Sequence, residues 1–432
     1  MRASTLIPGF LISVILSAAV SADVVVTRLD AEKTVRGISL SIEGGQLSVQ
    51  TADGKVEKIS AAEVVEAVAL PAPSPPIASK RPFEVVLLDG SRIRGILLAA
   101  PADHLRVQCA SLAPGHNVLV LPIEELLQVR RVAGATIPGA SRLVRVPDND
   151  AAYRLDGSKI TGTIESFGES GATMDRGDLG ARTIAYDDLA ALYVDNSAGA
   201  PQSGLLAVAR MNDGSTLVLQ PGFSITKGVL TGKTPAGIAI QAPASKLVAL
   251  GFRGGRFEHL SDRTPQRIER TPFFPLPEGA AKGVMLDFVC PVRMDRSPDD
   301  RAITLAGRGY FKGIGVRPTT ALTWDLMSGE LKGEFTRFEA LCGIDDEVLG
   351  AGYGRGGGTG SVVFTVELDG KEVWRSPVIR GGKPPERVSV VLGEARTLTL
   401  RVLVVPKAMM PKGREDSTEL DNAVWARPLL IR

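Results

Sequence analysis

Four acidic residues in the last third of the chain are the first candidates for chemistry. Asp345, Asp346 and Glu347 follow an alternating apolar segment, and Asp421 precedes the final apolar run. A pair of carboxylates can protonate a glycosidic oxygen and activate water, but this reaction needs a cleft and a defined separation between the two groups. Spacing along the chain establishes neither, so these residues alone do not predict an active site.

Other catalytic groups are scarce. The only histidines are His104, His116 and His259, and none stands beside a plausible nucleophile motif or in a metal-binding spacing. Residues 350–360, GAGYGRGGGTG, have glycine spacings similar to those of a phosphate-binding loop. A dinucleotide fingerprint requires a helix after the glycines, whereas residues 361–366 have the pattern of a strand. We therefore expect a glycine-rich loop and a protein that is not an enzyme.

The segments that must position these residues have the pattern of β-strands. Trp324 alternates with Leu322 and Leu326, which predicts a strand with one buried face and places Trp324 in the core. Gly313 and Gly315 are two residues apart, and we expect the backbone there to bend or to be closely approached. Aromatic faces can stack on the C–H groups of sugars. The pattern around Trp374 leaves the environment of that residue open.

A series of short motifs runs through residues 283–432. In order they are Tyr310-Phe-Lys-Gly-Ile-Gly-Val316, Trp324-Asp-Leu326, Phe338-Glu-Ala, Gly343-Ile-Asp-Asp346, Ser361-Val-Val-Phe-Thr-Val366, Asp369-Gly370, Ser376, Leu398-Thr-Leu400 and Asp421-Asn-Ala-Val-Trp425. This ordered series resembles the NPCBM/NEW2 family, a carbohydrate-binding module often attached to glycoside hydrolases. The resemblance implies a galactose-binding-like jelly-roll β-sandwich, in which Trp425 belongs to a structural closing motif.

The resemblance also implies where a ligand would bind. If the strands pair as in the family, residues from three segments converge at one end of the sandwich and bind carbohydrate: Tyr310, Arg317, Asp345, Asp346, Asp421 and Asn422. Galactose-binding-like sandwiches often carry a structural calcium ion, so Asp345 and Asp346 are candidate calcium ligands, and solvated loop charges are the alternative. Val424, Arg317 and the segment 406–417 depart from the family pattern, which puts a sugar site on those loops in doubt but not the fold.

Residues 23–262 contain a divergent internal repeat of short strands, each unit closing on an acidic and apolar segment. Asp-Gly pairs at 89–90, 156–157 and 213–214 predict tight hairpins, which we assign to type I′ turns because these need positive φ. Each unit either closes as a small SH3-like barrel or pairs its edges with another unit. The predicted fold is therefore all-β, with SH3-like repeats followed by the jelly roll.

Composition shifts divide the chain. We expect a signal peptide at 1–22, β repeats at 23–70, 83–132, 151–196 and 205–262, a Pro-rich linker at 263–282 and the NPCBM-like domain at 283–432. The first 22 residues have a basic start, an apolar run and a small-residue boundary near Ala22, and a membrane anchor is the alternative. No later stretch is long enough to span a bilayer. The mature protein is predicted to be secreted, periplasmic or in the cell envelope.

Net charge and cysteine count limit the classes of binding partner and the number of disulfides. A net charge of +2 with scattered basic residues does not indicate nucleic acid or an anionic membrane surface. Three cysteines are too few for a disulfide scaffold. Cys290 and Cys342 are left as either a disulfide or two buried thiols.

The leading functional prediction is an exported, non-catalytic protein that binds carbohydrate through its C-terminal module. The alternative is a structural or interaction protein of the cell envelope whose sandwich contacts proteins instead of sugars. A third interpretation, a glycoside hydrolase, lacks an identifiable catalytic domain in this sequence.

Overall fold

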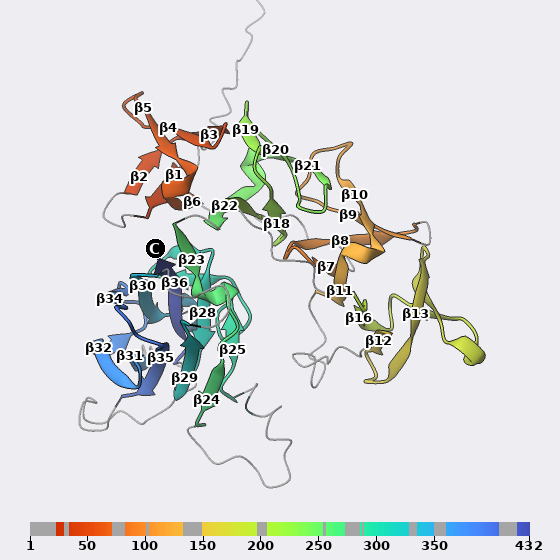
Figure 1. Ribbon diagram of the computed structural model, residues 1–432. Coiled ribbons are helices and arrows are strands. Elements are labelled where there is room, and N and C mark those ends of the chain that lie inside the picture. The colour runs from red at the N-terminus through yellow and green to blue at the C-terminus, as the bar shows by residue number, and fades with distance from the viewer. Residues whose placement is uncertain are drawn as a thin grey trace, which may run out of the picture.

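The computed structural model describes residues 23–29, 34–70, 83–100, 103–132, 149–196, 205–253, 256–272, 286, 289–327, 335–349, 360–405 and 421–432. The signal peptide predicted at 1–22 and most of the glycine-rich segment 350–360 lie outside these residues. The described part consists almost entirely of β-strands with short 3-10 turns, which confirms the all-β prediction (Figure 1). None of the helical segments in these residues is long and apolar enough to cross a membrane.

The first half of the chain forms four strand-rich units. Unit one contains β1 (Asp23–Arg28), β2 (Thr34–Gly37), β3 (Ser39–Glu43), β4 (Gln46–Gln50), β5 (Val56–Ser60), η1 (Ala61–Glu63) and β6 (Val64–Leu70). Unit two contains β7 (Phe83–Leu87), β8 (Arg92–Leu98), β9 (His104–Gln108), β10 (Val118–Pro122), η2 (Ile123–Glu125) and β11 (Leu126–Arg131). Both units place a 3-10 turn directly before their closing strand.

Unit four has the same 3-10 turn before its closing strand, whereas in unit three the 3-10 turn lies one strand earlier. Unit three contains β12 (Asp150–Arg154), β13 (Lys159–Phe167), β14 (Gly171–Asp175), η4 (Gly177–Leu179), β15 (Arg182–Ala185) and β16 (Leu189–Tyr193). Unit four contains β17 (Leu206–Met211), β18 (Thr216–Leu219), β19 (Ser224–Thr226), β20 (Val229–Lys233), β21 (Ala239–Pro243), η5 (Ala244–Lys246) and β22 (Leu247–Arg253). In all four units the first strand pairs antiparallel with the closing strand.

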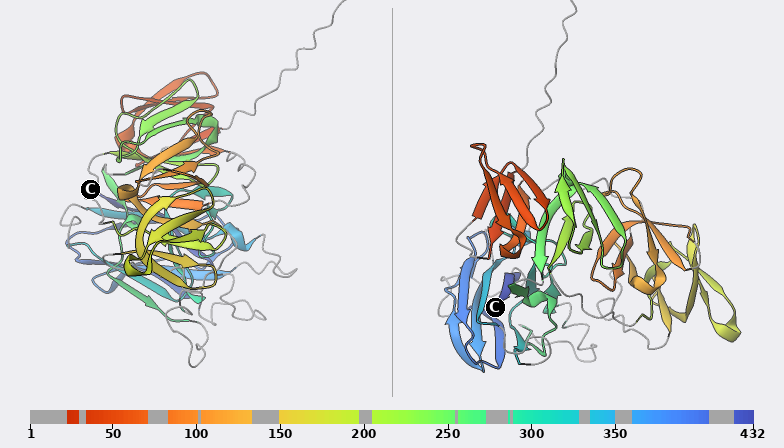
Figure 2. Two further views of the ribbon diagram at one scale, coloured as in Figure 1. Left: turned by 90° about the vertical axis from the view of Figure 1, so that its right-hand side faces the viewer. Right: turned by 45° about the horizontal axis from the view of Figure 1, so that its top comes forward.

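The units join edge to edge in an order that differs from the chain order. Closing strands β11 and β16 pair with each other, closing strands β6 and β22 pair with each other, and β8 meets β18. The units therefore lie side by side as three, two, four and one, along the arc seen in Figures 1 and 2. Of the two arrangements expected from the sequence, pairing of edges between units is present; closure of each unit as an SH3-like barrel stays a prediction.

The Asp-Gly pairs form hairpin turns, but the predicted type I′ geometry is wrong. In all three turns φ is positive at the glycine and not at the aspartate before it. The amide of Gly90 donates to the Leu87 carbonyl at 3.0 Å, and the Leu87 amide donates to the Ser91 carbonyl at 2.9 Å. This is a type I turn followed by a glycine bulge. The Asp89 side chain accepts the Ser91 amide at 2.6 Å, which favours this form over type I′.

A glycine in the second strand of units one to three permits close contact between strands. A Cβ added at each of these glycines would approach a backbone carbonyl oxygen to 2.1–2.6 Å: Gly37 to Gln50, Gly95 to Gln108 and Gly162 to Asp175. Any side chain there would collide with the backbone of the neighbouring strand. The same requirement at matching positions supports the interpretation of these units as repeats.

Replacing Gly162 with alanine is expected to lower the free energy of unfolding by about 1–3 kcal/mol, because the methyl group overpacks the β13–β14 pair. Gly168→Ala is the matched control, since a Cβ there meets only the Gly171 carbonyl oxygen at 3.4 Å. Urea unfolding followed by far-ultraviolet circular dichroism measures both. Equal effects of the two substitutions would contradict the steric explanation.

The last part of the chain forms a two-sheet sandwich. One sheet has the order β25 (Val292–Met294), β28 (Gly313–Val316), β36 (Ala423–Ile431), β30 (Arg337–Ile344) and β34 (Glu386–Val391), with β23 (Phe257–His259) also paired to β36. The other has the order β24 (Arg267–Arg270), β29 (Thr320–Asp325), β35 (Thr397–Val404), β31 (Ser361–Leu368) and β32 (Lys371–Arg375), with β33 (Ile379–Arg380) paired to β31. The hairpin of β26 (Ile303–Leu305) and β27 (Arg308–Tyr310) lies outside both sheets.

Large aromatic side chains fill the space between the two sheets. Trp324 and Trp425 are each 1% exposed, which confirms the predicted core position of Trp324 and the structural place of Trp425. Trp374 is half-buried at the edge strand β32. Cys290 and Cys342 are buried free thiols. Of the two alternatives, a disulfide or two buried thiols, the structure therefore has the second.

The boundary between the repeats and the sandwich is not a simple linker. Residues 267–270, inside the segment predicted as a linker at 263–282, form β24 and pair with β29. β23, which the sequence groups with the fourth repeat, pairs with β36. An apolar cluster of Val68, Val208, Ala249 and Phe311 connects units one and four to the sandwich. The repeats and the sandwich therefore share a packed interface.

Candidate functional site

A polar network occupies one end of the sandwich, where the β25–β26 and β28–β29 loops meet the segments after β30 and before β36. Arg317 donates from Nε to Asn422 Oδ1 at 2.9 Å and from Nη2 to Asp299 Oδ1 at 2.6 Å. The Asn422 amide donates to Asp299 Oδ2 at 3.1 Å. The network thus contains a closed triangle of three side chains. We call these three residues, together with Glu347 and Ser297, the loop-end cluster.

Asn422 is the centre of this cluster. Its Nδ2 also donates to Glu347 Oε1 at 2.6 Å, and Ser297 Oγ donates to Glu347 Oε2 at 2.6 Å. Asn422 is 1% exposed, whereas the side chains of Arg317 and Asp299 remain 20% and 42% exposed. Burial and the nearby Asp299 charge raise the pKa of Glu347 against the effect of its hydrogen bonds. The buried side-chain amide of Asn422 therefore orients Arg317 and Asp299, two charged side chains that solvent can reach.

Glycine at position 315 brings the Ser297 loop into place. A Cβ on Gly315 would lie 2.4 Å from the Arg296 carbonyl oxygen and 2.7 Å from the backbone of Ser297. This confirms the close approach expected at Gly315 from the sequence. Because the loop passes so near β28, Asp299 reaches the side chain of Arg317, which follows directly after that strand.

Asp345 and Asp346 tie the segment after β30 to the β26–β27 hairpin. Asp345 accepts the amides of Thr304 at 2.9 Å and Glu347 at 3.0 Å, and it begins η8 (Asp346–Val348) as an N-cap. Asp346 accepts the amides of Ala306 at 3.0 Å and Gly307 at 2.7 Å. Burial raises the pKa of Asp345 to about 7 despite these donors. Both side chains therefore position loops.

A calcium ion at Asp345 and Asp346 stays a prediction. Calcium requires several oxygen ligands arranged around one point. Each carboxylate oxygen of these two residues already accepts a backbone amide, which uses part of its acceptor capacity. Within the described residues, no group of three or more acidic, histidine or cysteine side chains is arranged to hold a metal ion.

Two of the six predicted binding residues lie apart from the exposed surface of the cluster. Asp421 is 3% exposed and accepts the Ser361 amide at 2.6 Å, so it fixes the start of β31. Tyr310 is also 3% exposed, and the guanidinium groups of Arg308 and Arg427 lie 5.3 and 5.8 Å from the centroid of its ring. Tyr310 therefore belongs to the interface with the repeats. Among the six, Arg317 and Asp346 keep partial exposure.

Sequence reasoning missed Asp299 and Ser297 as members of the cluster. They lie in Ser297-Pro-Asp-Asp300, a composition typical of a turn, and Asp300 N donates to the Ser297 carbonyl at 3.0 Å. This composition predicts a turn but does not indicate which side chains Asp299 and Ser297 contact. Glu347 is recognisable in the sequence as part of an acidic run, but its contact with Asn422 depends on tertiary structure.

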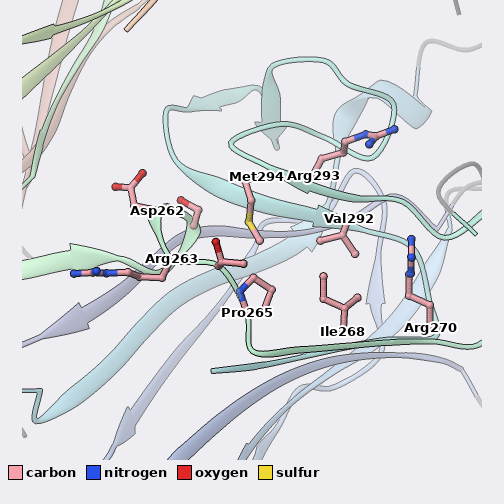
Figure 3. A pocket seen from close by; sticks show the side chains of 10 residues that line it. Asp262, Arg263, Pro265, Ile268, Arg270, Val292, Arg293 and Met294 are labelled. Carbon is pink, nitrogen blue, oxygen red and sulfur yellow. The ribbon is translucent and has the colours of Figure 1, made fainter. Parts of the chain in front are cut away.

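A second concave region lies at the side of the sandwich, between edge strands β24 and β25. It is an open groove of about 400 Å³, lined by the 261–265 segment, Ile268, Arg270 and residues 292–294 (Figure 3). Ile268, Val292, Pro265 and Met294 lie between Asp262 at one end and the two arginines Arg270 and Arg293 at the other in Figure 3. The groove is separate from the loop-end cluster in its lining residues.

Comparison with known proteins places the C-terminal part of the chain in a family. The NPCBM/NEW2 domain model matches residues 277–431. Alpha-1,3-galactosidase B of Akkermansia muciniphila is 29% identical over 133 residues, which are 31% of this chain and 14% of that protein. The chain thus matches about a seventh of the length of this curated relative.

Solved structures similar to this chain include carbohydrate-binding modules. The CBM51 module of Clostridium perfringens GH95, in complex with methyl-galactose, has 23% identity and a TM-score of 0.30, covering 40% of this chain and 99% of that chain. The tandem CBM51 modules of Sp3GH98 from Streptococcus pneumoniae have 14% identity and a TM-score of 0.29, covering 95% and 96%. The family match is the specific finding, and residues 277–431 are an NPCBM/NEW2 domain.

Proposed function

We propose that the NPCBM/NEW2 domain binds carbohydrate at the loop-end cluster, with Arg317, Asp299 and Glu347 contacting the sugar. The observation that carries this proposal is the partly exposed pair of Arg317 and Asp299, whose Nη2 and Oδ1 atoms are 2.6 Å apart. The buried Asn422 forms a hydrogen bond with each of them. Arg317 offers N–H donors and Asp299 offers acceptor oxygens at neighbouring positions. Adjacent sugar hydroxyls each donate and accept, so they can bind both groups at once.

In this proposal the other predicted binding residues position the sugar-contacting side chains and do not touch the sugar. Asn422 orients Arg317, Asp299 and Glu347, whereas Asp345, Asp346 and Asp421 fix the backbone of the loops that carry them. Tyr310 takes no part in sugar contact. Because Trp324 and Trp425 are buried, recognition rests on hydrogen bonds more than on stacking, and we expect modest affinity, roughly 10 μM to 1 mM.

Replacing Arg317 with alanine is expected to weaken sugar binding by about 10- to 150-fold, which corresponds to the roughly 1.5–3 kcal/mol of a hydrogen bond to a charged group. A glycan array that includes galactose-terminated glycans identifies the ligand, and isothermal titration calorimetry compares the variants. Arg401→Ala is the matched control, since Arg401 also pairs with a carboxylate, Glu367, at 2.9 Å, outside the cluster. Unchanged affinity of Arg317→Ala would exclude this cluster as the site.

Export and lack of catalysis are parts of the same proposal. The signal peptide predicted at 1–22 would deliver the domain to glycans outside the cytoplasm. The carboxylates of the cluster are held by N–H and O–H donors, which suits binding rather than proton transfer to a substrate. If no glycan binds with or without calcium and pull-downs recover cell-envelope proteins, the alternative of a protein-interaction module replaces this one.

A further inference from the structure

Two kinds of contact alternate along the row of repeat units. Units three and two meet through their closing strands β16 and β11, and units four and one meet through β22 and β6. Units two and four meet through their second strands, β8 and β18. Unit three lies at one end of the row, where its closing strand is already paired and its second strand, β13, faces outward (Figure 1).

The contact between β8 and β18 is built from two equivalent halves. Each strand follows an Asp-Gly-Ser turn, and the serine of each turn accepts an amide of the other strand. Arg94 N donates to Ser215 Oγ at 2.9 Å, and Val218 N donates to Ser91 Oγ at 3.0 Å. Each donor stands three residues after the serine of its own turn. The two serines are 1% exposed or less, so the contact encloses them.

Unit three has the same turn before its second strand. Asp156 accepts the Ser158 amide at 2.9 Å, as the aspartates of units two and four accept the amides of their own serines. The Arg154 amide donates to the Ser158 carbonyl, which closes the turn. Hydrogen-bonded positions alternate along an antiparallel pair. The backbone amides of Lys159 and Thr161 therefore point away from β12, as that of Arg94 points away from β7.

No described strand pairs with the outer side of this segment. β12 lies on one side of residues 159–162, and β14 pairs only with residues 163–167 of β13. Ser158, Lys159 and Thr161 are exposed, whereas the matching serines of units two and four are buried. A strand edge of this kind presents N–H and C=O groups to which another strand can pair.

We propose that the start of β13 pairs with the same segment of a second copy of this chain, which gives a symmetric dimer. Ser158 Oγ of each copy accepts the Thr161 amide of the other, as the serines of units two and four do within one chain. A twofold dimer places the same surface on both sides of its interface. Unit three meets this condition because it carries the complete motif, with the serine and an outward-facing amide three residues later.

The register of the β8–β18 contact fixes the register of the dimer. Arg92 lies opposite Thr216, and each directly follows the serine of its turn. The matching residue of unit three is Lys159, which therefore lies opposite Lys159 of the second copy. Like charges directly opposite one another destabilise a strand pair. The Nζ atom of Lys159 lies 5.6 Å from the centroid of the Tyr153 ring, so each ammonium group also has a partner in its own unit.

Unit one is a poorer partner for β13. Its second strand, β2, lies at the other end of the row. Ser158 stands four residues before Gly162, and at the position four residues before Gly37 unit one has Lys33 instead of a serine. A contact between β13 and β2 would form one of the two serine hydrogen bonds. Being head-to-tail, it would also produce rings or open chains of copies.

Sedimentation equilibrium of the intact protein between about 1 and 500 μM tests the proposal. We expect a monomer–dimer equilibrium with a Kd on the order of 10–100 μM, which tightens as salt screens the opposed lysines. Thr161→Pro removes an amide that faces outward and should raise the Kd at least about tenfold. Ser158→Ala should raise it at least about fivefold, because the dimer loses two hydrogen bonds. Lys159→Thr should lower it about two- to fivefold.

Thr183→Pro is the matched control. Thr183 is exposed on β15, the other outer strand of unit three, and the same alternation points its amide away from β14. This variant should keep the Kd of the unsubstituted protein, and circular dichroism checks that each variant is folded. The proposal is overturned if the protein stays monomeric at about 500 μM, if it forms assemblies larger than two copies, if Thr183→Pro weakens association as much as Thr161→Pro, or if Lys159→Thr weakens it.

Discussion

Replacing Trp425 with alanine is expected to lower the free energy of unfolding of the sandwich by about 3–5 kcal/mol. Trp425 lies near the start of β36 and is 1% exposed. Its ring contacts Phe364 edge-on at 4.9 Å and Phe338 at 6.4 Å between ring centroids. Alanine would remove the transfer free energy of the indole and leave a cavity between two sheets whose backbones are fixed by pairing on both sides of β36.

Trp374→Ala is the matched control for this substitution. Trp374 is half-buried on the edge strand β32, so its removal opens no enclosed cavity and should cost less than about half as much. Urea unfolding followed by tryptophan fluorescence reports on the sandwich in both variants, because all three tryptophans lie in residues 324–425. A smaller loss for Trp425→Ala than for Trp374→Ala would contradict the assigned core.

Replacing Glu66 with alanine is expected to cost about 3–5 kcal/mol by leaving the buried Arg427 and the partly buried Arg308 without their counter-charge. Glu66 is 2% exposed on β6 of unit one. Arg308 of the sandwich donates to Glu66 Oε1 at 3.2 Å and to Thr27 Oγ1 at 2.8 Å, and Arg427 approaches Glu66 Oε1 to 3.8 Å. The substitution should therefore loosen the contact between the sandwich and unit one, in addition to lowering stability.

Glu63→Ala is the control, because Glu63 forms a surface pair with Arg28 at 2.6 Å and is 46% exposed. Such exposed pairs contribute about 0–1 kcal/mol. Chemical unfolding recorded in parallel by circular dichroism and tryptophan fluorescence distinguishes the effects. We expect the two signals to coincide in the unsubstituted protein and to separate in Glu66→Ala; coincident curves with little loss of stability would show that the ion pair does not hold the two parts together.

The candidate site was predictable only in part. The motif pieces indicated the segments that carry Arg317, Asp345 and Asn422, since each adjoins a strand whose alternation is visible in the sequence. They did not indicate which side chains stay exposed. Tyr310 is buried in an apolar cluster with Ile303 and Val424, and the arginines over its ring, Arg308 and Arg427, reach Glu66 in another unit, more than 200 residues away. Asp299 joins Arg317 because Gly315 admits the loop that carries it.

Local interactions explain what the sequence determined about this protein. Strand alternation, the Asp-Gly-Ser hairpins and the glycines that need close backbone approach depend on residues a few positions apart, so they can be read without the fold. Even there the turn type needed the structure, because the aspartate side chain accepts the serine amide and the aspartate keeps a negative φ. The all-β class follows from these local features.

Tertiary structure alone decided how these pieces meet. The repeat units present similar free edges, and nothing local specifies that β6 pairs with β22 or that unit two lies between units three and four. The same holds for β24 and β25, which border one groove only because they end different sheets at the same side of the sandwich. Pairing between distant edges depends on packing of the whole chain, and residue patterns along a single strand do not record it.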